Sequence, residues 1–378
     1  MPRSSTFAGV VAAFLSLVLA SPSQGAGGSL DRNFGQGTGY VQYRGSVAAK
    51  WRISAVSAQA DGRAIIAGFA DNTLLVRRYA LDGTMDTGFG ANGTLEFPLP
   101  QPPGYIQTPR IVEGADGVYV AAGGTVRRLD AQGRIDQGFW PQDIVVGYHP
   151  DGGAVFRLLV PSDRRMVVVT SQFAEVPTDN ISVRYYLPSG LPDAVRGDAN
   201  GEKLLGPPDG GRYVPMDAVL LGDGRVLILA RWLRRDGHYG LVLVRLMPDA
   251  SLDPGFGNTG TLVLGADMAM VANPSLAISG SGKIAVAYGV DGALSELSTS
   301  YFVVRMLRAD GSVDTSMPSG GVMSIPIAND RNGSKRSYSA RLFYSGGKFV
   351  VLCGAGLWQF DPLAGGGIPA PVVIDRHK

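Results

Sequence analysis

Cysteine and histidine are scarce in this chain. Its 378 residues include one cysteine, Cys353, and three histidines, His149, His238 and His377. A single cysteine excludes an internal disulfide framework, and three scattered histidines offer no cluster from which a zinc site could be built. Cys353 lies within an apolar run and is therefore expected to be a core residue.

The chain also lacks an excess of charge of either sign. Its 34 Lys and Arg residues almost balance its 32 Asp and Glu residues, which leaves a formal net charge of +2. A chain this close to neutral has no net field to attract nucleic acid or an anionic membrane. We therefore expect no nucleic-acid partner.

Residues 1–26 have the features of an export signal. Arg3 supplies a basic start, residues 7–20 form an apolar run of 14 residues, and a segment of small residues follows. The run is shorter than the roughly 20 residues that a membrane-spanning helix needs, and no later run approaches that length. We predict cleavage between residues 20 and 26 and export to a periplasm or the extracellular space; an uncleaved anchor is the alternative.

Familiar catalytic patterns are missing from the sequence. It has no Gly-x-Ser-x-Gly elbow, no His-Glu-x-x-His pair and no histidine near its only cysteine. Its glycine-rich stretches precede expected strands, so a phosphate-binding loop would have no helix terminus to use. The sequence therefore favours a non-enzymatic protein without a cofactor.

An internal repeat dominates what is present. Leu81 to Gly93 reads LDGTMDTGFGANG, Asp249 to Gly260 reads DASLDPGFGNTG, and weaker copies precede, separate and follow them. Spacings of 50 to 61 residues separate the second aspartates of successive copies, Asp31, Asp86, Asp136, Asp193, Asp253 and Asp314. A phenylalanine lies three residues after four of them, at Phe34, Phe89, Phe139 and Phe256.

Each repeat also carries a pattern typical of four antiparallel strands. Two apolar runs flank a short turn, as in 56–68 and 219–230, and are followed by a third run, the aspartate motif and an edge-like fourth run. Asp-Gly between β-branched residues indicates a two-residue type I′ hairpin; Arg164 replaces the glycine in one repeat, for which we expect a different turn. Six such units predict an all-β, six-bladed β-propeller over residues 27–378.

Closure of the propeller has two candidates. Residues 37–43 and 370–374 both resemble a fourth strand, and we favour the N-terminal segment as the one that completes the last blade. An open stack of β-sheets is the alternative architecture, although it would leave exposed sheet edges.

The hairpin followed by Val-Arg-Arg-Tyr-x-x-Asp-Gly-x-x-Asp-x-x-Phe-Gly resembles the delta-60 repeat of exported and surface-associated bacterial proteins. The resemblance extends over 27–378 and implies a propeller-like scaffold, but neither a reaction nor a ligand. Arg196 and Met317 depart from the pattern at the phenylalanine position.

We expect the second aspartate of each motif to cap a turn and the phenylalanine to pack between blades. A calcium site is a weaker alternative, because no copy has the oxygen density of a calcium loop. Arginines recur eight or nine residues before that aspartate, as in Arg77 and Arg78. Pairing with aspartate between blades is the favoured interpretation, and a ring of guanidinium groups holding an anion is the alternative.

The connections expected on the opposite face of the propeller vary, which marks that face as free for binding. The segment 231–240 contains five residues of types enriched or suitable at binding surfaces, Trp232, Arg234, Arg235, His238 and Tyr239. Further candidates in neighbouring connections are Tyr105, Arg212 and Tyr213.

These observations favour a monomeric binding or structural module of the bacterial envelope or the extracellular space. Its expected partner is a glycan, a peptide or an envelope protein. The alternative is a propeller hydrolase or lyase, with or without a metal ion, whose central-channel site would require Glu113, Asp217 and Asn273 to converge.

Overall fold

The computed structural model describes residues 33, 36, 52–70, 73–98, 109–122, 125–139, 144–145, 155–172, 180–268, 271–290, 300–316, 318–327, 341–345, 347–353 and 356–360. The chain divides into two compact units, residues 1–167 with 186–191 and residues 168–185 with 192–378. Among the described residues, all strands belong to six antiparallel sheets, which we number 1 to 6 in chain order.

The first unit contains sheets 1 and 2 and the first strand of sheet 3. Sheet 1 has the order β1-β2-β3-β4, with the strands Arg52–Ala58, Ala64–Ala70, Thr73–Tyr79 and Thr94–Pro98. Sheet 2 has the order β5-β6-β7-β8, with the strands Arg110–Gly114, Gly117–Ala122, Thr125–Leu129 and Ile144–Val145. Sheet 3 has the order β12-β11-β10-β9, with β9 at Val155–Leu159, β10 at Met166–Gln172, β11 at Asn180–Tyr186 and β12 at Glu202–Leu205.

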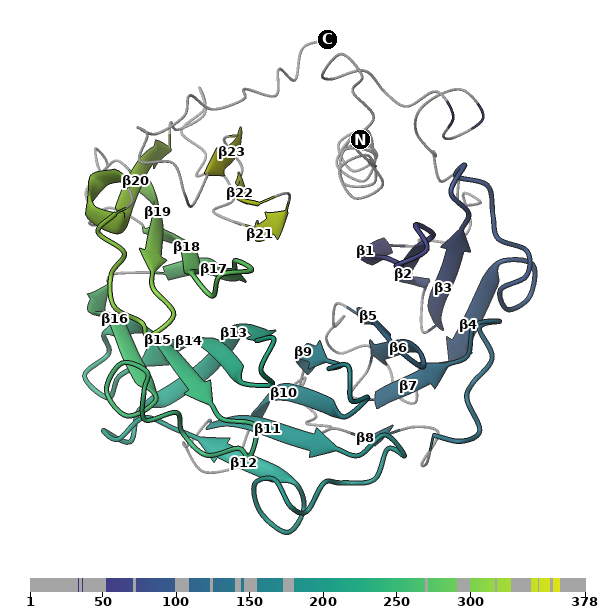
Figure 1. Cartoon of the computed structure of the whole chain (residues 1–378), viewed down its shortest axis with the longest axis horizontal. Helices are drawn as coiled ribbons and strands as arrows, with labels where there is room; N and C mark the ends of the chain where they lie inside the picture. Colours follow the sequence, from purple (N-terminus) through teal and green to yellow (C-terminus); the bar gives the residue numbers. More distant parts are fainter. Residues whose placement is uncertain are drawn as a thin grey trace. The chain divides into compact units, whose positions relative to one another are not determined.

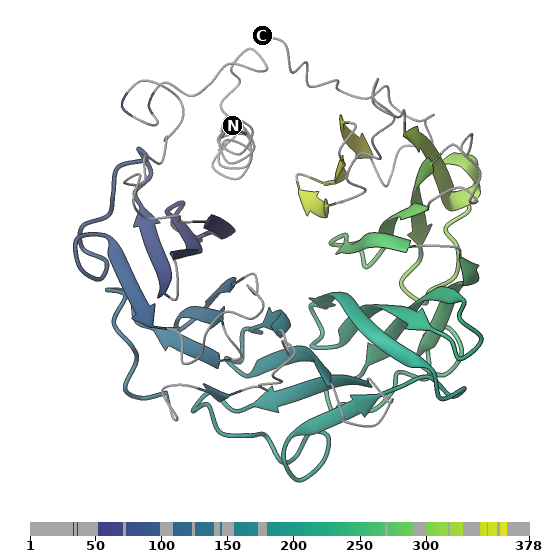
Figure 2. The same cartoon turned by 180° about the vertical axis from the view of Figure 1, so that it is seen from behind.

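The second unit contains sheets 4, 5 and 6 (Figures 1 and 2). Sheet 4 consists of β13 to β16, with the bounds Arg212–Leu220, Val226–Leu233, Tyr239–Leu246 and Thr261–Met268. Sheet 5 consists of β17 to β20, with the bounds Val271–Ile278, Ile284–Val290, Ser300–Leu307 and Val322–Ile327. Sheet 6 has three described strands, β21 to β23, with the bounds Arg341–Ser345, Lys348–Cys353 and Gly356–Phe360.

The strand pattern confirms the predicted all-β propeller class. In each of sheets 1 to 5 four consecutive strands pair with their chain neighbours, as the repeat predicts for a blade. First strands of successive sheets contact one another within each unit, β1 with β5 and β5 with β9, and β13 with β17 and β17 with β21. The two candidate closing segments, 37–43 and 370–374, lie outside the described residues, so their roles remain predictions.

Apolar side chains from adjacent sheets form the core between them. One cluster joins Leu229 and Leu243 of sheet 4 to Val286 and Tyr288 of sheet 5. Because each central strand has neighbours on both of its faces, both alternating rows of side chains are buried, as in β15, where seven of eight residues are buried. The two-sided apolar runs of the sequence therefore reflect packing between blades.

The hairpin turns of sheets 1, 3, 4 and 5 differ from the sequence prediction. In the β1–β2 turn, Gly62 donates its backbone N–H to the carbonyl of Gln59 and has a φ of 85°, whereas neither central residue of the turn has a positive φ. The turn is thus a type I turn followed by a left-handed residue rather than a two-residue type I′ turn. The prediction of a different turn at Arg164 was also wrong, because Arg164 takes this left-handed position with a φ of 62° and bonds Pro161 in the same way.

Candidate functional site

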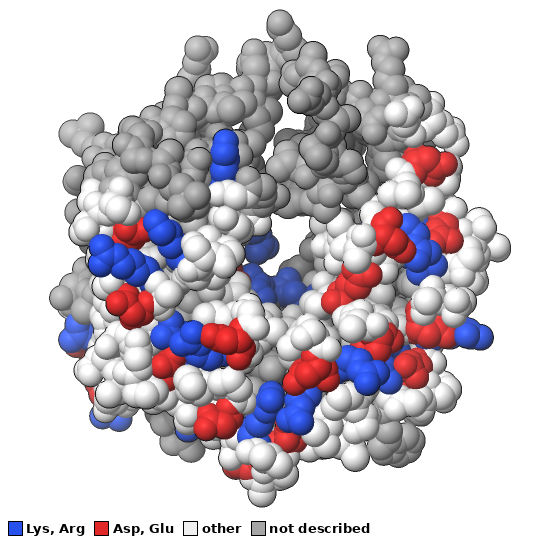
Figure 3. Space-filling model, in the orientation of Figure 1, with Lys and Arg blue, Asp and Glu red and all other residues white. Residues whose placement is uncertain are grey.

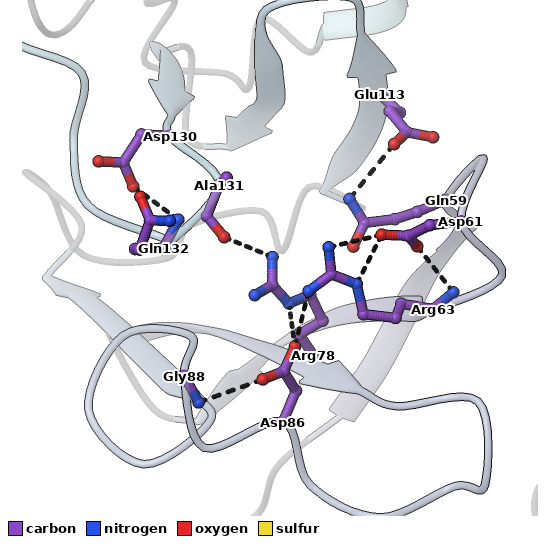
Figure 4. Close-up of polar contacts among 10 residues, drawn as sticks. All are labelled: Gln59, Asp61, Arg63, Arg78, Asp86, Gly88, Glu113, Asp130, Ala131 and Gln132. Atoms are coloured by element: carbon purple, nitrogen blue, oxygen red, sulfur yellow. Dashed lines mark hydrogen bonds and ion pairs between the residues drawn. The ribbon is translucent and has the colours of Figure 1, made fainter.

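The second aspartate of the motif is the centre of a conserved set of contacts within the repeat. In sheet 1, Asp86 Oδ1 accepts the backbone N–H of Gly88, and Asp86 Oδ2 accepts hydrogen bonds from Arg78 and Arg63 at 2.7 and 3.0 Å (Figure 4). In sheet 4, Asp253 has the same three kinds of partner, Gly255, Arg245 and Arg225. The aspartate therefore caps its own turn and neutralises an arginine of the third strand at the same time.

The same arginine extends to the next sheet. Arg78 Nη1 donates to the carbonyl of Ala131 at 2.7 Å, and Arg128 Nη1 donates to the carbonyl of Pro188 at 2.9 Å. Arg245 makes the corresponding bond to the carbonyl of Ala309. In all three cases the acceptor is in the aspartate-motif turn of the following repeat, so this arginine joins sheets 1, 2 and 4 to the sheets that follow them.

The motif phenylalanine packs beneath that arginine and against the next turn. The guanidinium carbon of Arg78 lies 4.5 Å from the centre of the Phe89 ring, and that of Arg245 lies 4.3 Å from the Phe256 ring. A Cβ atom added at Gly133, in the next turn, would lie 2.7 Å from Phe89. The glycine of the repeat is thus required by close contact as well as by its φ of 77°.

Sheet 3 keeps this arrangement with the two residue types exchanged. Tyr185 occupies the arginine position and Arg196 the phenylalanine position, and the guanidinium lies 5.9 Å from the Tyr185 ring. Arg196 Nε still lies 3.5 Å from a carboxylate oxygen of Asp193. In the next turn Ala250, with a φ of 69°, replaces the glycine. A methyl group fits there because the motif of sheet 3 has no phenylalanine to contact it.

These contacts compensate nearly all the charge of the motif. Burial raises the pKa of Asp253, but hydrogen bonds from Arg225 and Gly255 and the charge of Arg245 outweigh it, so the pKa lies below its usual value. The pKa of Asp86 is lowered in the same way, against burial, by Arg63 and Arg78. Figure 3 shows basic side chains lying beside acidic ones in this view. A row of paired charges of this kind serves the scaffold.

The arginines one position earlier in the third strand have other local partners. Arg77 Nε donates to Thr94 Oγ1 at 3.2 Å, Arg184 Nε donates to Glu202 at 3.2 Å, and Arg305 Nε donates to the Tyr288 hydroxyl at 3.0 Å. Arg127 lies 5.0 Å from the Phe97 ring. These side chains are bound within or between sheets, which is the arrangement that a scaffold role predicts.

The residues considered for a catalytic channel site are also engaged. Glu113, near the end of β5, accepts the backbone N–H of Ala60 at 2.7 Å. Its other carboxylate oxygen accepts the Gln59 side-chain amide at 3.4 Å (Figure 4). Asp217 is 5% exposed and accepts hydrogen bonds from Ser275 Oγ and the Leu276 backbone N–H of sheet 5. Through these hydrogen bonds, each carboxylate links the first strand of its own sheet to a neighbouring sheet. The side chain of Asn273 lies outside the described ones.

The segment 231–240 is more ordered than the sequence suggested. Residues 231–233 end β14 and residues 239–240 begin β15, so the connection is a tight turn over 234–238 rather than a long loop. In this turn Arg234 donates its N–H to the His238 carbonyl, and Gly237 has a φ of 85°. The connection is shorter than the sequence suggested because β14 and β15 extend into both ends of the segment.

Trp232 is held by a second turn that precedes β13. Its Nε1 donates to Asp209 Oδ1 at 3.2 Å, and its ring meets the buried Tyr213 edge to face at 6.3 Å. Arg235 Nε donates to the Gly210 carbonyl at 3.1 Å, which joins the two turns. We call the surface formed by Asp209, Gly210, Trp232, Arg234, Arg235 and His238 the sheet 4 rim.

The rim presents fixed groups of several kinds. Trp232 is half-buried, whereas Arg235 and His238 are exposed. The Arg234 guanidinium carbon lies 5.4 Å from the Trp232 ring centre and its Nη2 lies 2.8 Å from Asp236. Burial raises the pKa of Tyr213 to about 12, so this residue is a neutral packing group beneath the tryptophan.

The structure brings most of the predicted binding residues to one end of sheet 4. Arg212 and Tyr213 begin β13 and Tyr239 begins β15, beside the rim. Tyr105, Asp31 and Phe34 lie outside the described residues. Sequence reasoning missed Asp209 as the partner of Trp232 and Gly210 as the partner of Arg235, because these partners lie 23 and 25 residues away along the chain. It also missed Arg231, which the strand pattern alone would have assigned to a buried column.

Within the described ranges no group of three or more His, Cys, Asp or Glu side chains is placed to hold a metal ion. That part of the chain also contains no helix with the length and apolarity needed to cross a membrane.

Comparison with known proteins gives one family match. Residues 59–89 match the family described as "Domain of unknown function (DUF5122) beta-propeller". The matched stretch holds the β1–β2 turn, β2, β3 and the motif of sheet 1, so it supports a β-propeller repeat. No curated protein matches the chain.

Several solved structures are similar in fold. An α-L-arabinofuranosidase of Fusarium graminearum is 10% identical, with a TM-score of 0.39 over 85% of this chain and 84% of that one. A protein of unknown function from Dyadobacter fermentans is 12% identical, with a TM-score of 0.43 over 85% and 92%. A polysaccharide lyase acting on ulvan is 9% identical, with a TM-score of 0.46 over 84% and 80%. Similarity at this level assigns neither a reaction nor a ligand to this chain.

Proposed function

We propose that this chain is an exported, non-catalytic β-propeller protein that binds a glycan at the sheet 4 rim. The observation that carries the proposal is the fixed position of Trp232, which remains half-exposed although Asp209 and Tyr213 hold it. A preorganised aromatic ring loses little entropy when a ligand binds, and Trp, Tyr and Arg dominate the energetics of binding surfaces.

The polar groups around the ring favour a glycan over an apolar partner. Asp209 and Arg234 contact Trp232, and with Arg235 and His238 they give the rim hydrogen-bonding groups of both kinds. One aromatic surface with a few placed polar groups is the arrangement that binds a ring with many hydroxyls. A peptide or an envelope protein is the other kind of partner and is an outcome of the binding experiment below.

The absence of catalysis is part of the proposal. Glu113 and Asp217, the carboxylates considered for a channel site, accept backbone hydrogen bonds from neighbouring sheets. A general acid or base needs a carboxylate that can reach a substrate proton, and these two are committed to the scaffold. Export follows from the signal features of residues 1–26.

The proposal is tested by equilibrium binding of the purified mature chain to a glycan array and to a peptide array. The double variant Arg235→Ala/His238→Ala removes two exposed groups and should weaken glycan binding by about tenfold or more. Arg308→Gln is the matched control, because Arg308 is exposed in an aspartate-motif turn of sheet 5. Binding to peptides alone, or glycan binding that survives the double variant, would contradict the proposal.

A further inference from the structure

Arg231 is unusual among the buried and half-buried arginines of the described structure. Arg78, Arg128 and Arg245 each donate to a carboxylate, and Arg184 donates to Glu202. The Nε atoms of Arg231 and Arg212, in contrast, are buried and donate no hydrogen bond within the described residues, although Arg212 has another interaction. Burying a guanidinium N–H without an acceptor is unfavourable, which makes Arg231 a candidate site for an anionic ligand.

The strand register places other donors around Arg231. It pairs with Val214 on β13 and with Leu241 on β15, so it shares a sheet face with Arg212 and Tyr239, two residues away on those strands. Diagonal neighbours on one face have Cβ atoms roughly 7–8 Å apart. The register therefore places Arg212, Arg231 and Tyr239 on one face of sheet 4, the face that packs toward sheet 5.

Three acidic side chains in this end of sheet 4 have other partners. Asp209 bonds Trp232, Asp236 pairs with Arg234, and Asp217 bonds sheet 5. Strand β16 adds Asp267 to the same end, because its last residue, Met268, pairs with Tyr239. The four arginines 212, 231, 234 and 235 therefore outnumber the aspartates 209, 236 and 267 by one, which leaves a local charge of 4 − 3 = +1.

We propose that Arg231, with Arg212 and Tyr239, binds an acidic group, and that the ligand of the sheet 4 rim is an extended acidic glycan bearing carboxylate or sulfate groups. This inference rests on the proposed glycan-binding function. Arg231 and Trp232 are adjacent on β14 and project from opposite faces of the sheet. A ligand that contacts both has to pass over the end of sheet 4, which a chain of several sugars can do and a single sugar cannot.

The first experiment compares oligogalacturonate with the same oligosaccharide after full methyl esterification, which removes only its charge, and with a sulfated oligosaccharide. The wild-type chain should bind at least one charged probe about tenfold more tightly than the neutral ester. Arg231→Gln should abolish this preference, Arg231→Lys should retain part of it, and Arg308→Gln should leave it unchanged. Equal binding of charged and neutral probes, or a preference that survives Arg231→Gln, would overturn the inference.

The second experiment separates this inference from the proposed function. Sulfate stabilises proteins generally, so the thermal stabilisation by sodium sulfate over sodium chloride at equal ionic strength is compared among variants. The wild type and Arg308→Gln should gain more from sulfate than Arg231→Gln. A smaller gain from sulfate in Arg231→Gln would support the anion site even if no glycan bound. An equal gain in all three, or a large loss of stability in Arg231→Gln without sulfate, would show that Arg231 serves packing and refute the site.

Discussion

Replacing Asp253 by alanine tests whether the repeated aspartate stabilises the scaffold. The Asp253 and Arg245 side chains are 6% and 3% exposed, so the substitution leaves a buried guanidinium without its carboxylate. Removing one partner of a buried ion pair generally costs about 3–5 kcal/mol. The Gly255 backbone N–H and Arg225 lose an acceptor as well.

The matched control is Asp223→Ala. Asp223 bonds the same Arg225, but its side chain is 50% exposed, and exposed ion pairs contribute at most about 1 kcal/mol. Urea unfolding followed by tryptophan fluorescence gives both values, and Trp232 reports on sheet 4 itself. Adding Arg245→Met to Asp253→Ala should recover more than about 1 kcal/mol, since the uncompensated charge is then gone. Equal losses for the two aspartates, or no recovery, would refute the reasoning.

Three further predictions concern the same scaffold. Asp217→Ala leaves the buried donors of Ser275 and Leu276 unsatisfied and should lower the free energy of unfolding by about 2–4 kcal/mol in urea titrations; a loss below 1 kcal/mol would contradict this. Gly133→Ala should destabilise by about 2–3 kcal/mol through its φ of 77° and contact with Phe89, whereas Gly224→Ala, whose nearest neighbour would lie at 3.6 Å, should cost only about 1 kcal/mol. Because the folded-state pKa of Asp253 is lowered, its contribution is complete above the unfolded pKa of about 3.9 and is lost as pH falls through the folded value. Melting temperatures between pH 7 and 2.5 should therefore fall less steeply for Asp253→Asn than for the wild type, and parallel curves would argue against the pair.

The sequence by itself determined the elements that local chemistry controls. Apolar runs and the glycines of the turns placed the hairpins within a few residues, as with 56–68 for the turn that joins β1 at Arg52–Ala58 to β2 at Ala64–Ala70. The cap of Gly88 by Asp86 also spans only two residues, so the motif could predict it. The sequence showed only that Arg196 departs from the pattern at the phenylalanine position. It did not show that Tyr185 and Arg196 exchange roles.

The tertiary structure decided which of these residues meet across sheets. Contacts such as Asp217 with Ser275, and Ser275 with the Leu342 backbone, join positions 58 and 67 residues apart, and no local propensity specifies them. The faces of β14 likewise follow from its register with β13 and β15, which separates Arg231 from Trp232 and sets Arg231 beside Arg212. A repeat therefore predicts its own strands and caps, whereas burial and charge pairing, on which binding depends, are properties of the packed sheets.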